Sequence, residues 1–96
     1  MNLGNAIKCI RKQRGFTQQE FASACRISQT YLSQIENNLK EPNLSVLKAI
    51  AEKLSIPLPI LFFQSITEED VQPRKRVMFK KIDPLVKKII DELFNV

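Results

Sequence analysis

Four uncharged side chains that can donate and accept hydrogen bonds lie close together in one short segment. They are Gln29, Thr30, Ser33 and Gln34. On a helix with 3.6 residues per turn, the last three point away from the apolar pair Leu32 and Ile35, and the first lies in the exposed first turn. A glutamine can bridge N6 and N7 of adenine, and serine or threonine can pair with several base edges. We therefore expect this face to contact the edges of DNA bases.

The alternative for the same face is plain solvation, which is the usual role of a polar helical stripe. A solvent face generally carries more lysine and glutamate than this one does. With Asn37 included, five uncharged hydrogen-bonding residues occupy positions where charged residues would be usual. The composition therefore favours a contact surface over a merely hydrated one.

Two short helices must hold this face in place. Phe21, Ala22 and Cys25 share one side of the first, and Leu32 and Ile35 share one side of the second. The break between the two apolar stripes, 25–27, is brief enough only for a tight turn. This pattern is typical of a helix-turn-helix, whose second helix enters the major groove of DNA.

Local signals predict five helices before residue 65 and no strand. Gly15 ends the first helix, Thr17 and Glu20 form a capping box, and Ser28 and Asn43 are N-caps of the third and fourth. The expected ranges are about 3–14, 29–36, 44–54 and 58–63, and the second helix lies between the Thr17 cap and the break at 25–27. We take 1–64 as one domain and 65–96 as an appendage.

The appendage is expected to be a basic linker followed by an amphipathic sixth helix. The stretch 73–81 carries five positive charges and no acid, and its first part, 73–76, suits either a solvated linker or additional phosphate contacts. Asp83 is the predicted N-cap of the sixth helix, with Pro84 at its first position. Its large apolar residues cover about half of the helical wheel.

Such an apolar half-wheel must be buried, either on its own domain or against a second subunit. We favour a homodimer, because two-fold operators mirror dimeric proteins. An exposed Ile60 and Phe63 pair on the fifth helix also needs a cover. The predicted interface residues are Ile60, Phe63, Leu85, Val86, Ile89, Ile90, Leu93 and Phe94.

Composition limits the other functions that the chain can have. The 96 residues carry a net charge of +5, which suits nucleic acid, an anionic membrane or an acidic protein. No apolar run reaches the roughly 20 residues that span a bilayer, so we expect no membrane partner. The first ten residues do not resemble a signal peptide, so we expect a cytoplasmic protein. With no histidine, two cysteines and two glycines, the sequence supports neither an enzyme nor a metal or cofactor site.

Three segments carry a resemblance to a known family: GFTQQEFA at 15–22, ISQTYLSQIENN at 27–38 and LKAIAEKLSIP at 47–57. In this order and spacing, the chain resembles the phage repressor and Cro-like helix-turn-helix regulators, the XRE family, over residues 3–63. The resemblance implies an all-α, five-helix lambda-repressor-like domain. It also implies a DNA-binding transcriptional regulator, in particular a repressor, with double-stranded DNA as its partner.

The resemblance also assigns roles to individual residues. It implies base contacts by Gln29, Thr30, Ser33 and Gln34, and contacts to the DNA backbone by Gln18, Ser28, Tyr31, Asn37 and Lys40. Arg11 and Glu36 resemble an ion pair that ties the first helix to the third, the alternative being two unrelated surface charges. Arg26 and Asn38 stand where the family usually has glycine. A left-handed backbone at Arg26 would cost about 1 to 2 kcal/mol.

A second functional hypothesis belongs to another class. The chain could be an antitoxin-like interaction protein, whose C-terminal segment binds a partner protein while the helix-turn-helix regulates its own gene. General RNA binding is weaker, because Tyr31 is the only stacking aromatic on the proposed face.

Overall fold

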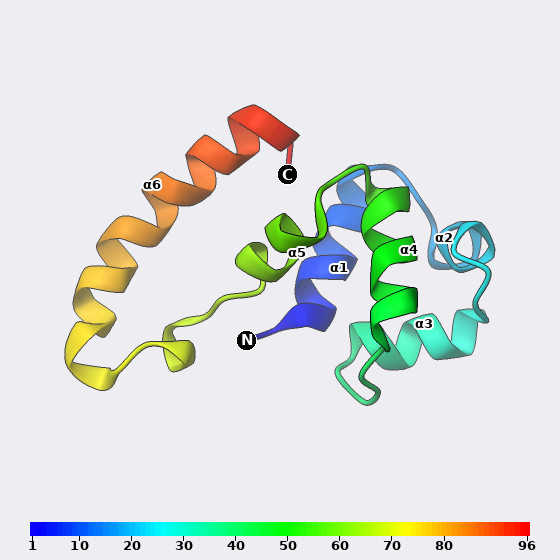
Figure 1. Ribbon diagram of the computed structural model, residues 1–96, viewed down its shortest axis with the longest axis horizontal. Helices are drawn as coiled ribbons and strands as arrows, with labels where there is room; N and C mark the ends of the chain where they lie inside the picture. The colour runs from blue at the N-terminus through cyan, green and yellow to red at the C-terminus, as the bar shows by residue number, and fades with distance from the viewer.

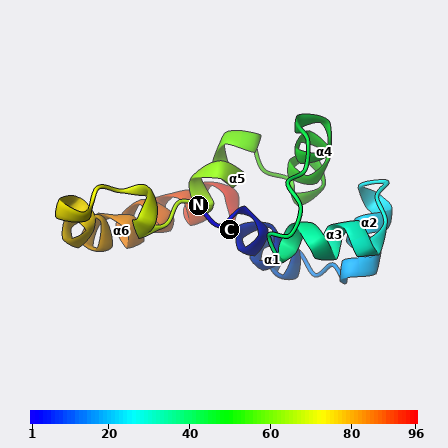
Figure 2. The ribbon, with the colours of Figure 1, turned by 90° about the horizontal axis from the view of Figure 1, so that it is seen from below.

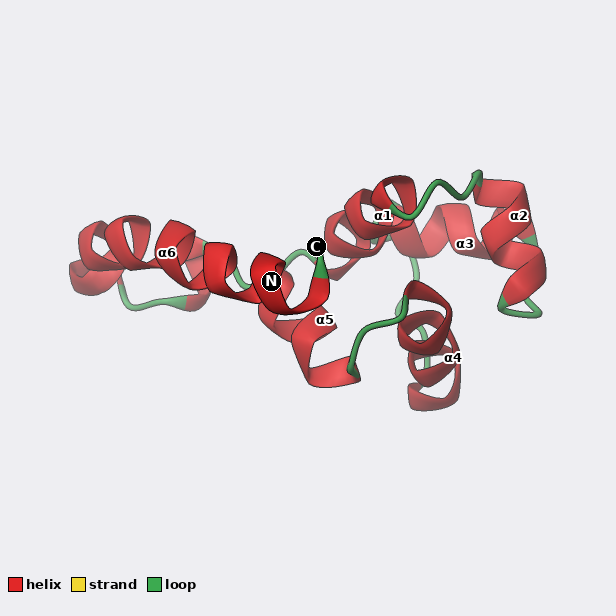
Figure 3. Ribbon diagram, turned by 90° about the horizontal axis from the view of Figure 1, so that it is seen from above, coloured by secondary structure: helices red, strands yellow, loops and turns green.

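The computed structural model describes all 96 residues and contains helices and loops without a strand (Figures 1 and 3). The α-helices are α1 (Leu3–Gln13), α2 (Gln18–Ala24), α3 (Gln29–Glu36), α4 (Leu44–Leu54), α5 (Leu58–Gln64) and α6 (Arg76–Phe94). Two short 3₁₀ turns, Glu68–Asp70 and Pro73–Lys75, connect α5 to α6. The predicted all-α class and the first five helices are thus confirmed. None of the helices combines the length and the apolar composition needed to cross a bilayer.

The helix ends follow the predicted local signals. Ser28 and Asn43 cap α3 and α4 by accepting the backbone N–H three residues ahead, at 3.0 and 2.9 Å. Gly15 follows α1 with a φ of 81°, a left-handed conformation that glycine adopts without strain. These caps fix where each helix begins and ends, and so which residues it turns inward.

One core holds α1 to α5 together. Its members come from all five helices, from Cys25 directly after α2 and from Ile56 two residues after α4, and several are completely buried. They are Ala6, Ile7, Ile10, Phe21, Ala22, Cys25, Leu32, Ile35, Leu47, Ile50, Ala51, Leu54, Ile56 and Leu61. The apolar stripes that the sequence placed on the two helices of the helix-turn-helix are therefore confirmed as core.

A glycine allows α1 to lie directly on the end of α3. A Cβ atom at Gly4 would come within 2.5 Å of the carbonyl oxygens of Ile35 and Glu36. The Gly4 N–H also donates to the side-chain oxygen of Asn38 at 3.0 Å. Asn38 has a φ of 59°, so this asparagine takes the left-handed position usually held by glycine.

The two cysteines differ in their surroundings. Cys9 is exposed and Cys25 is buried, and burial raises the pKa of the Cys25 thiol to about 11. Because the thiolate is the reactive form, Cys25 stays protonated and inert at pH 8. We expect an alkylating reagent to modify Cys9 alone in the native protein and both cysteines after denaturation, as mass spectrometry would show. Equal rates in the native state would contradict the buried position of Cys25.

The last helix begins earlier than the sequence predicted. We expected a basic linker followed by an N-cap at Asp83, but α6 begins at Arg76 and Pro84 lies inside it. Asp83 instead pairs with Lys87, one turn further along, at 3.2 Å. The predicted helix start at Asp83 is therefore wrong, and most of the basic stretch 73–81 is helical.

Tertiary contacts explain the early start of α6. The Arg76 Nε donates to the carbonyl oxygens of Glu68 and Val71, at 3.0 and 3.2 Å. These bonds hold the first turn of α6 against the 3₁₀ turn Glu68–Asp70 and the residue that follows it. Such contacts cannot be inferred from local N-cap residues. The prediction therefore followed the strong N-cap signal at Asp83 and placed the helix start too late.

Only the end of α6 meets the main domain. Ile90 is buried, Phe94 packs against the core, and Val86 is half-buried. Figures 1 and 2 show the rest of α6 as an arm at the opposite end of the molecule from α2 and α3. The prediction of one shared interface is wrong for Ile90 and Phe94, which are turned toward their own domain. On α5, Ile60 is half-buried and Phe63 is 36% exposed.

Candidate nucleic-acid interface

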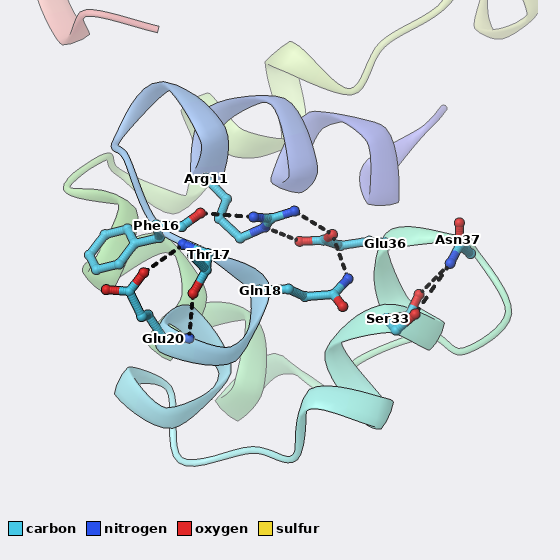
Figure 4. A network of polar contacts seen from close by, with 8 residues as sticks. All are labelled: Arg11, Phe16, Thr17, Gln18, Glu20, Ser33, Glu36 and Asn37. Atoms are coloured by element: carbon cyan, nitrogen blue, oxygen red, sulfur yellow. Dashed lines mark hydrogen bonds and ion pairs between the residues drawn. The ribbon is translucent and has the colours of Figure 1, made fainter.

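The candidate interface is built on α2, α3 and the turn between them. A capping box starts α2: the Glu20 N–H donates to the Thr17 hydroxyl at 3.1 Å, and the Thr17 N–H donates to the Glu20 carboxylate at 3.0 Å. Hydrogen bonding to Thr17 lowers the pKa of the Glu20 carboxyl, because it favours the charged form. The predicted capping box is confirmed (Figure 4).

The turn between α2 and α3 contains a strained residue. Arg26 has a φ of 59°, and its N–H donates to the Ser23 carbonyl at 3.1 Å. A left-handed backbone is unfavourable for a residue with a Cβ atom. The structure thus decides between an altered turn and a left-handed arginine in favour of the arginine, whose side chain is exposed beside the start of α3.

Replacing Arg26 by glycine should therefore stabilise the fold. We expect a gain of about 1 kcal/mol in the free energy of unfolding, because glycine adopts this conformation without the Cβ clash. Urea unfolding would measure it. Arg26→Ala is the matched control, since it removes the charge and keeps the Cβ atom. Equal stability of the two variants would contradict the presence of strain.

The third helix separates its buried and outward sides cleanly. Leu32 and Ile35 are fully buried, whereas Gln29 and Thr30 are exposed. Ser33 and Gln34 are half-buried on the same outward side. All four predicted base-contacting side chains thus belong to one helix. The Ser33 hydroxyl accepts a weak hydrogen bond from Asn37 at 3.5 Å. The other three side chains make no hydrogen bond within the protein.

A buried ion pair fixes the position of α3. The Arg11 Nε donates to Glu36 Oε2 at 2.7 Å, and Nη2 donates to Oε1 at 3.1 Å. Arg11 and Glu36 are 6% and 5% exposed, and Arg11 Nη1 also donates to the Phe16 carbonyl at 2.8 Å. The structure therefore brings these two residues together as a core contact between α1 and α3, not as two unrelated surface charges.

Gln18 belongs to the same network. Its Nε2 donates to Glu36 Oε1 at 3.1 Å, which ties the start of α2 to the end of α3 (Figure 4). The side-chain amide is therefore engaged within the protein. Its backbone N–H lies in the first turn of α2, where such groups have no partner inside the helix and suit an anion.

The other predicted backbone contacts surround α3. The Ser28 hydroxyl oxygen accepts from the Tyr31 N–H at 3.0 Å, which leaves the hydroxyl hydrogen free to donate. Asn37 is exposed, and its Nδ2 donates to the Ser33 carbonyl at 2.9 Å. Tyr31 is half-buried against the core, and Lys40 is exposed in the loop after α3.

One exposed residue beside this surface was not singled out in the sequence. Leu39, next to Lys40, is 74% exposed. Its N–H donates to the Gln34 carbonyl at 2.8 Å, so the loop is pinned to the last turn of α3. The sequence could have indicated this residue only by the presence of a leucine among polar loop residues, because helical periodicity does not apply to a loop.

Comparisons with known proteins agree with this geometry. A family model described as helix-turn-helix matches residues 7–61. The immunity repressor protein of Bacillus phage phi105 is 43% identical over 56 residues, which cover 58% of this chain and 39% of the repressor. The uncharacterised HTH-type transcriptional regulator YqaF of Bacillus subtilis is 40% identical over 63 residues, which cover 66% of this chain and 82% of YqaF.

A solved structure shows a similar arrangement of helices. The crystal structure of the clp gene regulator ClgR from C. glutamicum superposes with a TM-score of 0.64 at 30% identity. The match covers 67% of this chain and 83% of that one.

Proposed function

Because the chain belongs to the helix-turn-helix family, we propose that it is a sequence-specific DNA-binding transcriptional regulator that acts as a repressor. In this proposal α3 enters the major groove, where Gln29, Thr30, Ser33 and Gln34 contact base edges. One observation carries the proposal: these four uncharged side chains share the outward side of a helix whose inward side is anchored in the core. With a DNA ligand we infer a cytoplasmic location.

Contacts to the sugar-phosphate backbone would orient α3 in the groove. We assign these contacts to the backbone N–H of Gln18, the hydroxyl of Ser28, and the side chains of Tyr31, Asn37 and Lys40. The Gln18 side chain is assigned a different role from the one first expected, since it holds Glu36. No catalytic step is part of this function. Affinity comes from released counterions and groove contacts.

We also propose that two copies act together on a two-fold operator. One α3 helix contacts only a few base pairs, and dimers bind half-sites related by the same two-fold symmetry as the protein. The relatives named above are repressors or transcriptional regulators by description, which supports a regulatory role for a chain of this type.

A nuclear magnetic resonance titration with a short mixed-sequence duplex tests this function. We expect the largest changes in the amide signals of the first turn of α2, of α3 and of 37–40, and weakening of these changes as salt is raised. Changes confined to α6, or none at all, would contradict the proposed interface. A single-stranded RNA of matched length is the control, and we expect it to bind more weakly.

A further inference from the structure

A row of large apolar side chains on α6 has no cover. Its members are spaced by three or four residues, which places them on one side of the helix. They are Met78, Ile82, Leu85, Ile89 and Leu93, here called the α6 stripe, and their exposed fractions run from 47% to 71%. A contiguous exposed apolar surface of this kind usually marks an interaction site.

The stripe cannot simply turn back onto its own domain. The Arg76 bonds to Glu68 and Val71 fix the start of α6. At the other end, Arg14 Nη2 donates to the Phe94 carbonyl at 2.8 Å, while its Nε donates to the Leu54 carbonyl at 2.8 Å. With both ends held and Ile90 already buried, the stripe faces away from the domain.

The charges of α6 are distributed unevenly along its length. The stretch 74–82 carries five positive charges and no acid, whereas 83–96 has three acids and two lysines. Lys81 and Glu92 each come directly before a residue of the stripe, Ile82 and Leu93. Lys81 is in the first half of α6 and Glu92 is near its end. Such a helix repels a parallel copy of itself and complements an antiparallel one.

We propose that the α6 stripe binds the α6 stripe of a second copy of this chain, antiparallel, about a two-fold axis near Leu85. In this register Met78 faces Leu93 of the second copy and Ile82 faces its Ile89. The basic start of each helix lies beside the acidic end of the other, with Lys81 within a turn of the opposing Glu92. The helix dipoles also oppose one another favourably, and the interface is self-complementary, as two-fold symmetry requires.

This inference deepens the proposed function by naming the surface that joins the two copies on a two-fold operator. Figures 1 and 2 show that α6 lies away from α3, so the pairing leaves both α3 helices open to DNA. The tests below contain no DNA. A failure of the pairing is therefore distinguishable from a failure of DNA recognition.

Sedimentation equilibrium of the full chain over a concentration series tests the pairing. We expect a dimer for the wild type and a dimer dissociation constant at least roughly 100-fold higher for Leu85→Glu/Ile89→Glu, because charges would be buried in the apolar contact. Leu44→Glu, which changes a leucine with 56% exposure on α4, is the matched control and should remain dimeric. A monomeric wild type would overturn the proposal and would indicate that the stripe binds another protein. A double variant that remains dimeric would also overturn it.

Spin labels on α6 test the orientation. Labels go on single cysteines at Val77→Cys or Lys88→Cys, in a Cys9→Ser background that removes the exposed native thiol. With a rise of 1.5 Å per residue, the antiparallel register offsets the two position-77 labels by about 25 Å along the axis and the two position-88 labels by about 8 Å. A long distance at 77 and a short one at 88 supports the register. Equally short distances would indicate a parallel pair and overturn the antiparallel proposal.

Discussion

Replacement of Glu36 by alanine is expected to lower the free energy of unfolding by about 3 to 5 kcal/mol. Glu36 is 5% exposed and accepts from both Arg11 and Gln18. Without its carboxylate, the guanidinium of Arg11 stays buried with only the Phe16 carbonyl as an acceptor. Most of the loss is therefore the penalty of an uncompensated buried charge, not the net worth of the ion pair.

Urea unfolding of three variants would separate this penalty from other effects. Glu41→Ala removes an exposed acid from the loop before α4 and should change stability by less than about 0.5 kcal/mol. The paired change Arg11→Met/Glu36→Leu should recover much of the loss, because neither charge remains. A cost below about 1 kcal/mol for Glu36→Ala would show that the contact is not buried as described.

Replacement of both Gln29 and Gln34 by alanine should weaken binding to a specific operator by at least roughly 30-fold, since each bidentate contact to a base contributes about 1 to 3 kcal/mol. Binding to unrelated duplexes should change little, because it depends on phosphate contacts. The fold should be unaffected, since neither side chain takes part in a hydrogen bond within the protein.

Fluorescence anisotropy with a specific and an unrelated duplex would measure both affinities. Gln13→Ala changes an exposed glutamine at the end of α1 and is the matched control. An equal loss on both duplexes would indicate a backbone role for these glutamines. Unchanged affinity for the specific duplex would remove them from the contact surface.

The sequence predicted α1 to α5 well because their signals are local. Thr17, Ser28 and Asn43 each cap the helix that follows through a bond spanning three residues. The apolar spacing within each helix then determines which side enters the core. Such signals need no knowledge of distant contacts.

The start of α6 could not be predicted in this way. Asp83 followed by Pro84 is a strong local start signal, yet the helix begins seven residues earlier, where Arg76 donates to the carbonyl groups of Glu68 and Val71. The division of the apolar residues of α6 likewise depends on where the helix docks. Ile90 is buried and its neighbour Ile89 is exposed, although both are isoleucines on one amphipathic helix.

At the candidate interface, too, the sequence predicted local features but not contacts between helices. Periodicity placed Gln29, Thr30, Ser33 and Gln34 on the outward side of α3, where the structure has them. The resemblance to a family gave the pairing of Arg11 with Glu36, but no sequence pattern indicated that the Gln18 amide joins it. Only the packing of three helices makes that bond.

Selection of bound sites from a random pool of duplexes tests the central claim, that α3 recognises a specific sequence, most directly. The wild-type protein should enrich two half-sites related by two-fold symmetry. The Gln29→Ala/Gln34→Ala variant should lose preference at particular positions within each half-site. Enrichment of no motif by the wild type, or of the same motif by both proteins, would contradict base recognition by α3.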